Sequence, residues 1–221
     1  MYGYTRFYNE LQFLPLQRAS RMLPVLALTF LVLGLAITPS VAQAAQAAAT
    51  SKVHIYLIRG GLNVFSLGMD EIAAKLQRLG IHATVHNHLV WPLLAEEAAA
   101  EYKSGRVRTI ILVGHSWGAG AVTSMAAHLG VLGVPVKLAI GLDPSSHAAV
   151  SGNVGRYINY YISDGIGEAI DRSPQFHGKL ENVDVTKLPK MPDIRSIVGH
   201  FTLDKNQALQ DRVIREIRAA I

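Results

Sequence analysis

The stretch Val107–Leu129, VRTIILVGHSWGAGAVTSMAAHL, determines how the rest of the chain is interpreted. Its β-branched and apolar run at 109–113 predicts a buried strand, and the alanine-rich residues from 119 onward predict a helix that follows at once. Between them stands Gly114-His115-Ser116-Trp117-Gly118, which places a serine at the tip of a very sharp turn. Glycines are expected at 114 and 118 because side chains there would crowd the helix and the neighbouring strand.

This turn predicts a chemical role for Ser116. The pattern Gly-x-Ser-x-Gly between a strand and a helix is typical of a nucleophile elbow, which holds the serine hydroxyl above the sheet edge. The positive end of the helix favours developing negative charge, and the backbone amide of Trp117 would form half of an oxyanion hole. An ordinary turn with a capping serine is the alternative. On these residues the chain resembles the α/β-hydrolase superfamily.

Residues 1–44 have the features of a secretory signal peptide. Arg18 and Arg21 precede the uncharged apolar segment 23–37, and small residues follow in A-x-A patterns. The candidate cleavage sites follow three alanines: Ala42, Ala44 and Ala47. We therefore expect one exported domain over 45–221, in the periplasm or secreted. The alternative is an uncleaved segment that anchors the chain in a membrane, which usually takes about 20 apolar residues.

Composition narrows the classes of function and ligand. The net charge of +5 comes without any run of lysines or arginines, which gives little support to nucleic-acid binding. The chain contains no cysteine, so disulfides are excluded. Three histidines of equal parity, His82, His86 and His88, invite a metal-binding interpretation, but no carboxylate stands at a useful spacing nearby. We expect neither a metal nor a cofactor, and the sequence leaves the oligomeric state open.

Strand and helix patterns alternate along the mature chain, which predicts a parallel sheet with helices on both faces. We expect strands at 53–58, 83–86, 107–113, 136–142 and 156–163, and helices at 69–79, 92–102, 116–129 and after 204. With the resemblance, this is a three-layer αβα sandwich of α/β-hydrolase type with a minimal cap or none. Ligands of such folds bind at the carboxyl ends of the strands, where Ser116, the Gly60-Gly61 turn and Asp143 all lie.

The resemblance implies roles for two further parts of the site. In the superfamily the second oxyanion donor comes from the loop after an early strand, and Gly60-Gly61-Leu62 occupies that place here. We therefore expect the amide of Leu62 or of Gly61 to serve. The superfamily's histidine precedes the last helix, which matches His200. We expect Asp204 to cap that helix.

Two aspartates compete for the acid of the triad. The commoner family arrangement places the acid after the second strand beyond the nucleophile, which favours Asp164. A minority, including thioesterase-type members, place it after the first strand, which favours Asp143. We favour Asp143 because it ends an apolar strand abruptly, just before Pro144, and because the order Ser116, Asp143, His200 is that of the superfamily.

These residues together predict a serine hydrolase that cleaves carboxylic esters or thioesters through an acyl-enzyme on Ser116. The substrate would be a small-molecule or lipid-like ester in an open cleft. We expect the cleft to be lined by His88, Tyr157 and Tyr160, with Trp117 beside them. His115 faces away by strand alternation and is expected to serve packing. The alternatives are an acyl thioesterase and a non-catalytic binding protein with the hydrolase fold.

Overall fold

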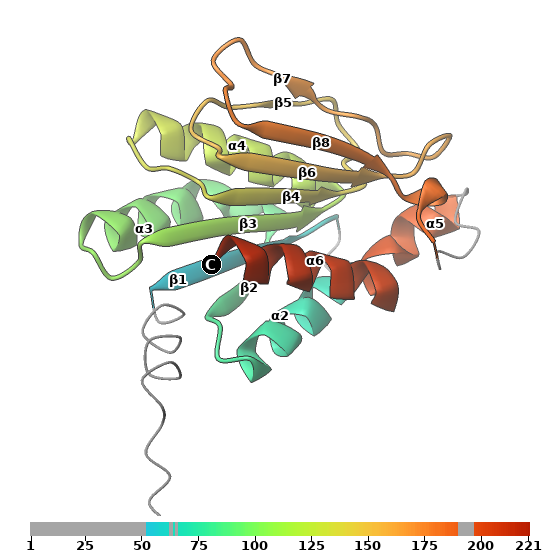
Figure 1. The fold of residues 1–221 in the computed structure, drawn as a ribbon, viewed down its shortest axis with the longest axis horizontal. Coiled ribbons are helices and arrows are strands. Elements are labelled where there is room, and N and C mark those ends of the chain that lie inside the picture. The colour runs from blue at the N-terminus through green and yellow to red at the C-terminus, as the bar shows by residue number, and fades with distance from the viewer. Residues whose placement is uncertain (1–51, 62–63, 65, 190–196) are drawn as a thin grey trace, which may run out of the picture. The chain divides into compact units, whose positions relative to one another are not determined.

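The apolar strands of the sequence pair into one sheet of six strands, all parallel, in the order β2-β1-β3-β4-β6-β8 (Figure 1). The strands are β1 Val53–Arg59, β2 Ala83–Asn87, β3 Thr109–His115, β4 Leu138–Leu142, β6 Arg156–Tyr161 and β8 Lys179–Asp184. This computed structural model describes residues 52–61, 64, 66–189 and 197–221. The signal segment 1–44 and Leu62 therefore lie outside the described residues.

Helices cover both faces of the sheet, as parallel strands require for their burial. One face is covered by α2 Gly68–Arg78 and α6 Gln207–Ala220, and the other by α3 Trp91–Lys103 and α4 Trp117–Val131 (Figure 1). Alternate residues of β1 enter different cores: Leu57 packs with α2 and α6, whereas Ile58 packs with α3 and α4. The predicted three-layer αβα sandwich is confirmed.

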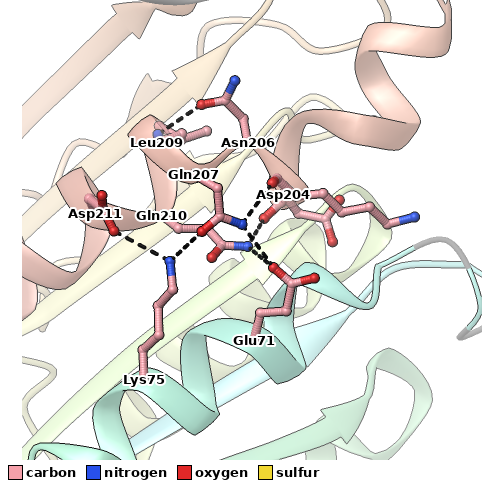
Figure 2. Close-up of polar contacts among 9 residues, drawn as sticks. Glu71, Lys75, Asp204, Asn206, Gln207, Leu209, Gln210 and Asp211 are labelled. Carbon is pink, nitrogen blue, oxygen red and sulfur yellow. Dashed lines mark hydrogen bonds and ion pairs between the residues drawn. The ribbon is translucent and has the colours of Figure 1, made fainter.

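Polar side chains join α2 to α6 and to the turn that precedes α6 (Figure 2). Nε2 of Gln210 donates to Glu71 Oε2 at 2.8 Å and to the backbone oxygen of Asp204 at 2.9 Å. Lys75 reaches Gln207 Oε1 at 2.7 Å. Between the two helices, Asp204 accepts the backbone N–H of Gly68 through Oδ2 at 2.8 Å. These contacts fix the start of α2 against the segment that precedes α6.

The structure departs from the sequence prediction in several places, most of them in the C-terminal half of the chain. Asn206, and not Asp204, caps α6, because its side chain accepts the N–H of Leu209 at 3.0 Å while Asp204 turns inward. The apolar segment before the last helix is itself a short helix. The elements that the pattern did not predict are β5 Ala149–Val150, β7 Asp171–Arg172, β8, α5 Ile197–Thr202, and the 3-10 turns η1 His88–Val90, η2 Val185–Lys187 and η3 Leu203–Lys205.

The strand order reverses between β1 and β3, and this reversal places the site. From β1 the chain moves outward to β2, then crosses back so that β3 pairs with the other edge of β1. The register pairs Ile58 with Gly114, so Gly60 and Ser116 leave neighbouring strands side by side. Ligands bind at such a switch point in open α/β sheets. Within the described part of the chain, none of the helices is both long and apolar enough to cross a membrane.

Candidate active site

The turn that carries Ser116 has the strained geometry of a nucleophile elbow. Ser116 has φ 57° and ψ −121°, a conformation that costs a non-glycine residue on the order of 1–3 kcal/mol. A Cβ on Gly114 would lie 2.2 Å from the backbone oxygen of Gly118, and one on Gly118 would lie 2.2 Å from that of Ile58. Both glycines are therefore required sterically, as the sequence predicts.

His200 faces the serine from α5. Its Nε2 lies 2.9 Å from Ser116 Oγ, and the two side chains are largely buried although they stand 84 residues apart. The other ring nitrogen, Nδ1, lies 2.6 Å from Asp143 Oδ2. A carboxylate can only accept, so Nδ1 carries the proton and Nε2 accepts from the serine hydroxyl. This is the hydrogen-bond direction that a serine nucleophile needs from its base.

Asp143 is held in place from several sides at the end of β4. It is fully buried, and its Oδ1 accepts the backbone N–H of Ile162 at 2.8 Å. The backbone of Gly167 packs so closely on it that an added Cβ would lie 1.9 Å from Oδ1. Asp164 is an exposed residue with φ 63° in the loop that follows β6. The structure thus brings Asp143 together with Ser116 and His200, and leaves Asp164 outside this group.

The Gly60-Gly61 turn lies directly against the elbow. The N–H of Gly60 donates to Ser66 Oγ at 2.9 Å, so this amide already has an acceptor within the protein. A Cβ on Gly61 would lie 2.9 Å from the Trp117 ring, which shows how closely this turn approaches α4. Trp117 is the first residue of α4, where amides have no partner within the helix. Of the two predicted donors in this turn, only Gly61 is among the described residues.

A pocket of about 280 Å³ opens at the serine. Its lining residues are Gly61, Ser66, His115, Ser116, Trp117, Ser145, Ile166, His200 and Phe201. The large apolar side chains among them are Trp117, Ile166 and Phe201. Phe201 directly follows His200, so the sequence offered a signal for it. Ser145 and Ile166 come from loops whose path no local pattern indicated.

The predicted substrate contacts on β6 are wrong. Tyr157 and Tyr160 are both fully buried and pack in the two opposite cores, because β6 is an inner strand covered on both faces. His88 does not line the pocket either. Its ring packs edge-on against Trp117 with 5.4 Å between centroids, so it contacts a residue of the pocket lining.

His115 makes polar contacts that the packing prediction missed. Strand alternation does turn it away from the nucleophile, toward the face covered by α2 and α6. There Nδ1 lies 2.8 Å from Ser66 Oγ, and Nε2 lies 2.8 Å from the carbonyl oxygen of His200. Burial, and next the proximity of His200, lower the pKa of His115 to about 4, so the ring is neutral at pH 7.

His82, His86 and His88, the three histidines considered as metal ligands, do not come together as a metal site. Among the described residues, no group of three or more His, Cys, Asp or Glu side chains could hold a metal ion. His86 instead contacts Thr84, with 2.7 Å between Nε2 and Oγ1. Burial lowers the pKa of His86, because a low-polarity setting disfavours its charged form.

No protein-family model matches this chain, and no curated protein matches it. Among solved structures it is similar to a protein described as a hydrolase of the α/β superfamily from Xanthomonas campestris pv. campestris. That match has 15% identity over 59% of this chain and 86% of the other, with a TM-score of 0.37.

A second solved structure with this similarity is an extracellular α/β-hydrolase from a Paenibacillus species, which itself shares structural and functional homology with tobacco salicylic acid binding protein 2. Its identity is 19%, over 42% of this chain and 41% of the other, with a TM-score of 0.29. The match therefore spans less than half of that protein's length.

Proposed function

We propose that this protein is a serine hydrolase that cleaves carboxylic esters by acyl transfer to Ser116. The proposal rests on two hydrogen bonds that share the His200 ring: one joins Ser116 Oγ to His200 Nε2, and the other joins His200 Nδ1 to Asp143 Oδ2. An aligned serine, imidazole and carboxylate lower the barrier to nucleophilic attack, because the proton has a base to go to and the resulting cation has a counter-charge.

The reaction follows from these atoms. Ser116 Oγ attacks the ester carbonyl carbon while His200 Nε2 takes the hydroxyl proton. The tetrahedral oxyanion is stabilised by the amide of Trp117 and by one from the Gly60-Gly61-Leu62 turn. The imidazolium, held by Asp143, then gives its proton to the leaving alkoxide, which departs as an alcohol. Water attacks the acyl-enzyme by the same route and releases the carboxylic acid, with the proton returned to Ser116.

The surroundings of the pocket support an apolar, lipid-like acyl group. Three of the large apolar side chains that are exposed in the described part of the chain, Trp117, Ile166 and Phe201, line the pocket. Exposed Leu67 directly follows the lining residue Ser66, and exposed Leu89 directly follows His88, whose ring packs on Trp117. An apolar rim of this kind favours binding of apolar matter next to the serine.

A thioesterase is the second candidate. It is favoured by the position of Asp143, which follows the first strand after the nucleophile strand, an arrangement that the superfamily resemblance associates with thioesterase-type members. Ester and thioester cleavage need the same residues, since only the leaving group differs. The choice between them therefore depends on relative rates with matched oxygen and sulfur substrates.

We further propose that the enzyme acts after export, since residues 1–44 have a positive flank, an apolar segment and small-residue cleavage sites. Mass spectrometry of the exported protein should find a new N-terminus between Gln43 and Ala48. Exported protein that still begins at Met1 would contradict this part of the proposal.

The central test is labelling by a fluorophosphonate, which reacts with activated serines. One label per chain is expected, on Ser116, and it should disappear in Ser116→Ala and slow strongly in His200→Ala. A panel of p-nitrophenyl esters with two to twelve acyl carbons, beside the matching thioesters, then defines the substrate. A folded wild-type protein that neither labels nor turns over any of them would be the non-catalytic binding protein instead.

A further inference from the structure

A buried row of polar groups joins the two loops on either side of Ser116. The N–H of Gly60 donates to Ser66 Oγ at 2.9 Å, and Ser66 Oγ lies 2.8 Å from Nδ1 of His115. At the far edge of the same ring, Nε2 lies 2.8 Å from the carbonyl oxygen of His200. Ser66 and His115 are each 1% exposed. The row therefore connects the proposed oxyanion turn to the backbone of the proposed base.

The direction of every bond in this row is fixed. The carbonyl oxygen of His200 can only accept, so Nε2 of His115 carries the proton. A neutral imidazole then offers Nδ1 as an acceptor, and the Ser66 hydroxyl must donate to it. The remaining lone pairs of Ser66 Oγ accept from Gly60. Each group thus donates once toward His200, an arrangement in which neighbouring bonds strengthen one another.

We propose that His115 is a positioning residue for acyl transfer, which sets the distance between the Gly60-Gly61 turn and His200 across the serine. The inference rests on the proposed function. His115 touches no reacting atom in this arrangement. It stands directly before Ser116, and strand alternation sends its side chain to the face where both loops arrive. A neutral imidazole is suited to the position because it has a donor and an acceptor on opposite edges of one rigid ring.

The surrounding structure separates this role from simple packing. The two segments that His115 joins are tied a second time, where Gly68 N–H donates to Asp204 Oδ2 at 2.8 Å. Loss of the His115 contacts therefore leaves the segments attached but less well aligned. Misplacement of reacting groups by about 1 Å can reduce the rate by about 10²-fold. We expect the effect mainly in kcat, because His115 is only 1% exposed where it lines the pocket and the larger apolar contacts of Trp117, Ile166 and Phe201 stay in place.

Two variants and a matched control test this role. His115→Leu removes both polar contacts, whereas His115→Gln keeps an N–H that reaches the His200 carbonyl. His54→Leu is the control, because His54 is also a buried histidine with two polar contacts, to Glu101 (2.7 Å) and Thr84 (2.9 Å), in the core on the other face of the sheet. Thermal melts give the folded fraction of each variant.

With folded protein matched, His115→Leu should label with fluorophosphonate, and turn over ester, about 10²-fold more slowly with KM nearly unchanged. His115→Gln should recover at least part of the loss, and His54→Leu should react like wild type. A wild-type rate in His115→Leu overturns the proposal. Equal losses in the Leu and Gln variants overturn it too, since ring shape and not the hydrogen bond would then matter.

A measurement independent of activity keeps the two proposals apart. In protein labelled with ¹⁵N-histidine, the ring signals of His200 should shift in His115→Leu and stay in place in His54→Leu. Unshifted signals overturn the positioning role even in an active enzyme. If the wild-type protein does not react at all, the hydrolase proposal fails. The spectra then show by themselves whether His115 positions the ring of His200. If His115→Leu does not fold, Ser66→Ala breaks the same row at the next group, and the same outcomes apply to it.

Discussion

The buried carboxylate of Asp143 accepts a hydrogen bond of 2.6 Å from Nδ1 of His200, although the two residues stand 57 positions apart. Its second oxygen accepts the backbone N–H of Ile162, so the carboxylate cannot rotate without breaking a bond. The imidazole is thereby held in one tautomer, with Nε2 toward Ser116. A single carboxylate group thus decides both the direction of the ring and the side on which it carries its proton.

Replacement of this carboxylate should abolish most of the activity. Asp143→Asn should lower kcat by about 10⁴-fold, as for the corresponding aspartate of serine proteases, because the amide can favour the wrong tautomer and offsets no charge. Asp164→Asn is the matched control and should behave like wild type, since Asp164 is exposed and asparagine tolerates its positive φ. Ester kinetics beside thermal melts check both. Full activity of Asp143→Asn would contradict this assignment.

Replacement of Gly118 by alanine should destabilise the fold far more than the same replacement of Gly120, which lies two residues further along α4. Gly118→Ala would place Cβ 2.2 Å from the backbone oxygen of Ile58 and should cost about 3 kcal/mol of unfolding free energy or more. Gly120→Ala meets only the end of the Ser146 side chain, at 3.0 Å, and should change stability by no more than about 1 kcal/mol. Urea denaturation measures both. Equal stabilities of the two variants would contradict the elbow packing.

Asp204 should make stability fall as pH rises. Burial raises the pKa of Asp204 to about 6 from a model-peptide value of 3.8, so between these values the folded state holds a proton that the unfolded state has lost. The contribution of Asp204 to the free energy of unfolding is therefore fully present below about pH 4 and is lost as the pH rises through 6. Asp204→Asn keeps an acceptor for Gly68 and removes the charge, so it should gain on wild type over this interval, by about 1 to 3 kcal/mol. Urea melts at pH 4 and 7.5 test this; a constant difference would contradict it.

His115 should act in the opposite direction over the same range. Its pKa is about 4 in the folded protein and about 6.5 in an unfolded chain, so here the unfolded state binds the extra proton. The stability is fully present above pH 6.5 and is lost as pH falls toward 4. His115→Gln does not titrate, so wild type should lose up to about 3 kcal/mol relative to this variant on acidification. Denaturant midpoints at pH 7 and 4.5 measure the change, and parallel curves for the two proteins would contradict it.

The sequence indicates the elements whose signals are local. The elbow is determined by Gly114 and Gly118, and the strands next to it by uninterrupted apolar runs. β8 was missed because its sequence, KLENVD, is polar, as suits an edge strand that is only partly buried. Asp143 could be favoured over Asp164 from its abrupt strand end, but only folding shows which aspartate meets His200.

The remaining errors concern contacts between distant segments. Tyr157 and Tyr160 are suited to a substrate cleft by chemistry, yet strand order places β6 inside the sheet. The Ser66–His115–His200 row joins loops that are far apart in the chain, so the spacing of these residues in the sequence does not predict their contacts. Sequence patterns predicted which residues stand at strand ends, whereas the partners of each residue depend on how the loops cross the sheet edge.

The sequence separation between Ser116 and His200 also bears on when reactivity can arise. The serine turn forms from neighbouring residues, but its base is supplied 84 positions later, after three further strands of the sheet. Parallel sheets built from such distant pairings fold slowly, because closing the long loops costs chain entropy before the strand contacts can form. An emerging or partly translocated chain that lacks α5 would therefore carry an inert serine. The activity proposed here would switch on only with the completed fold, so the proposed hydrolase would spare ester bonds near the site of its synthesis.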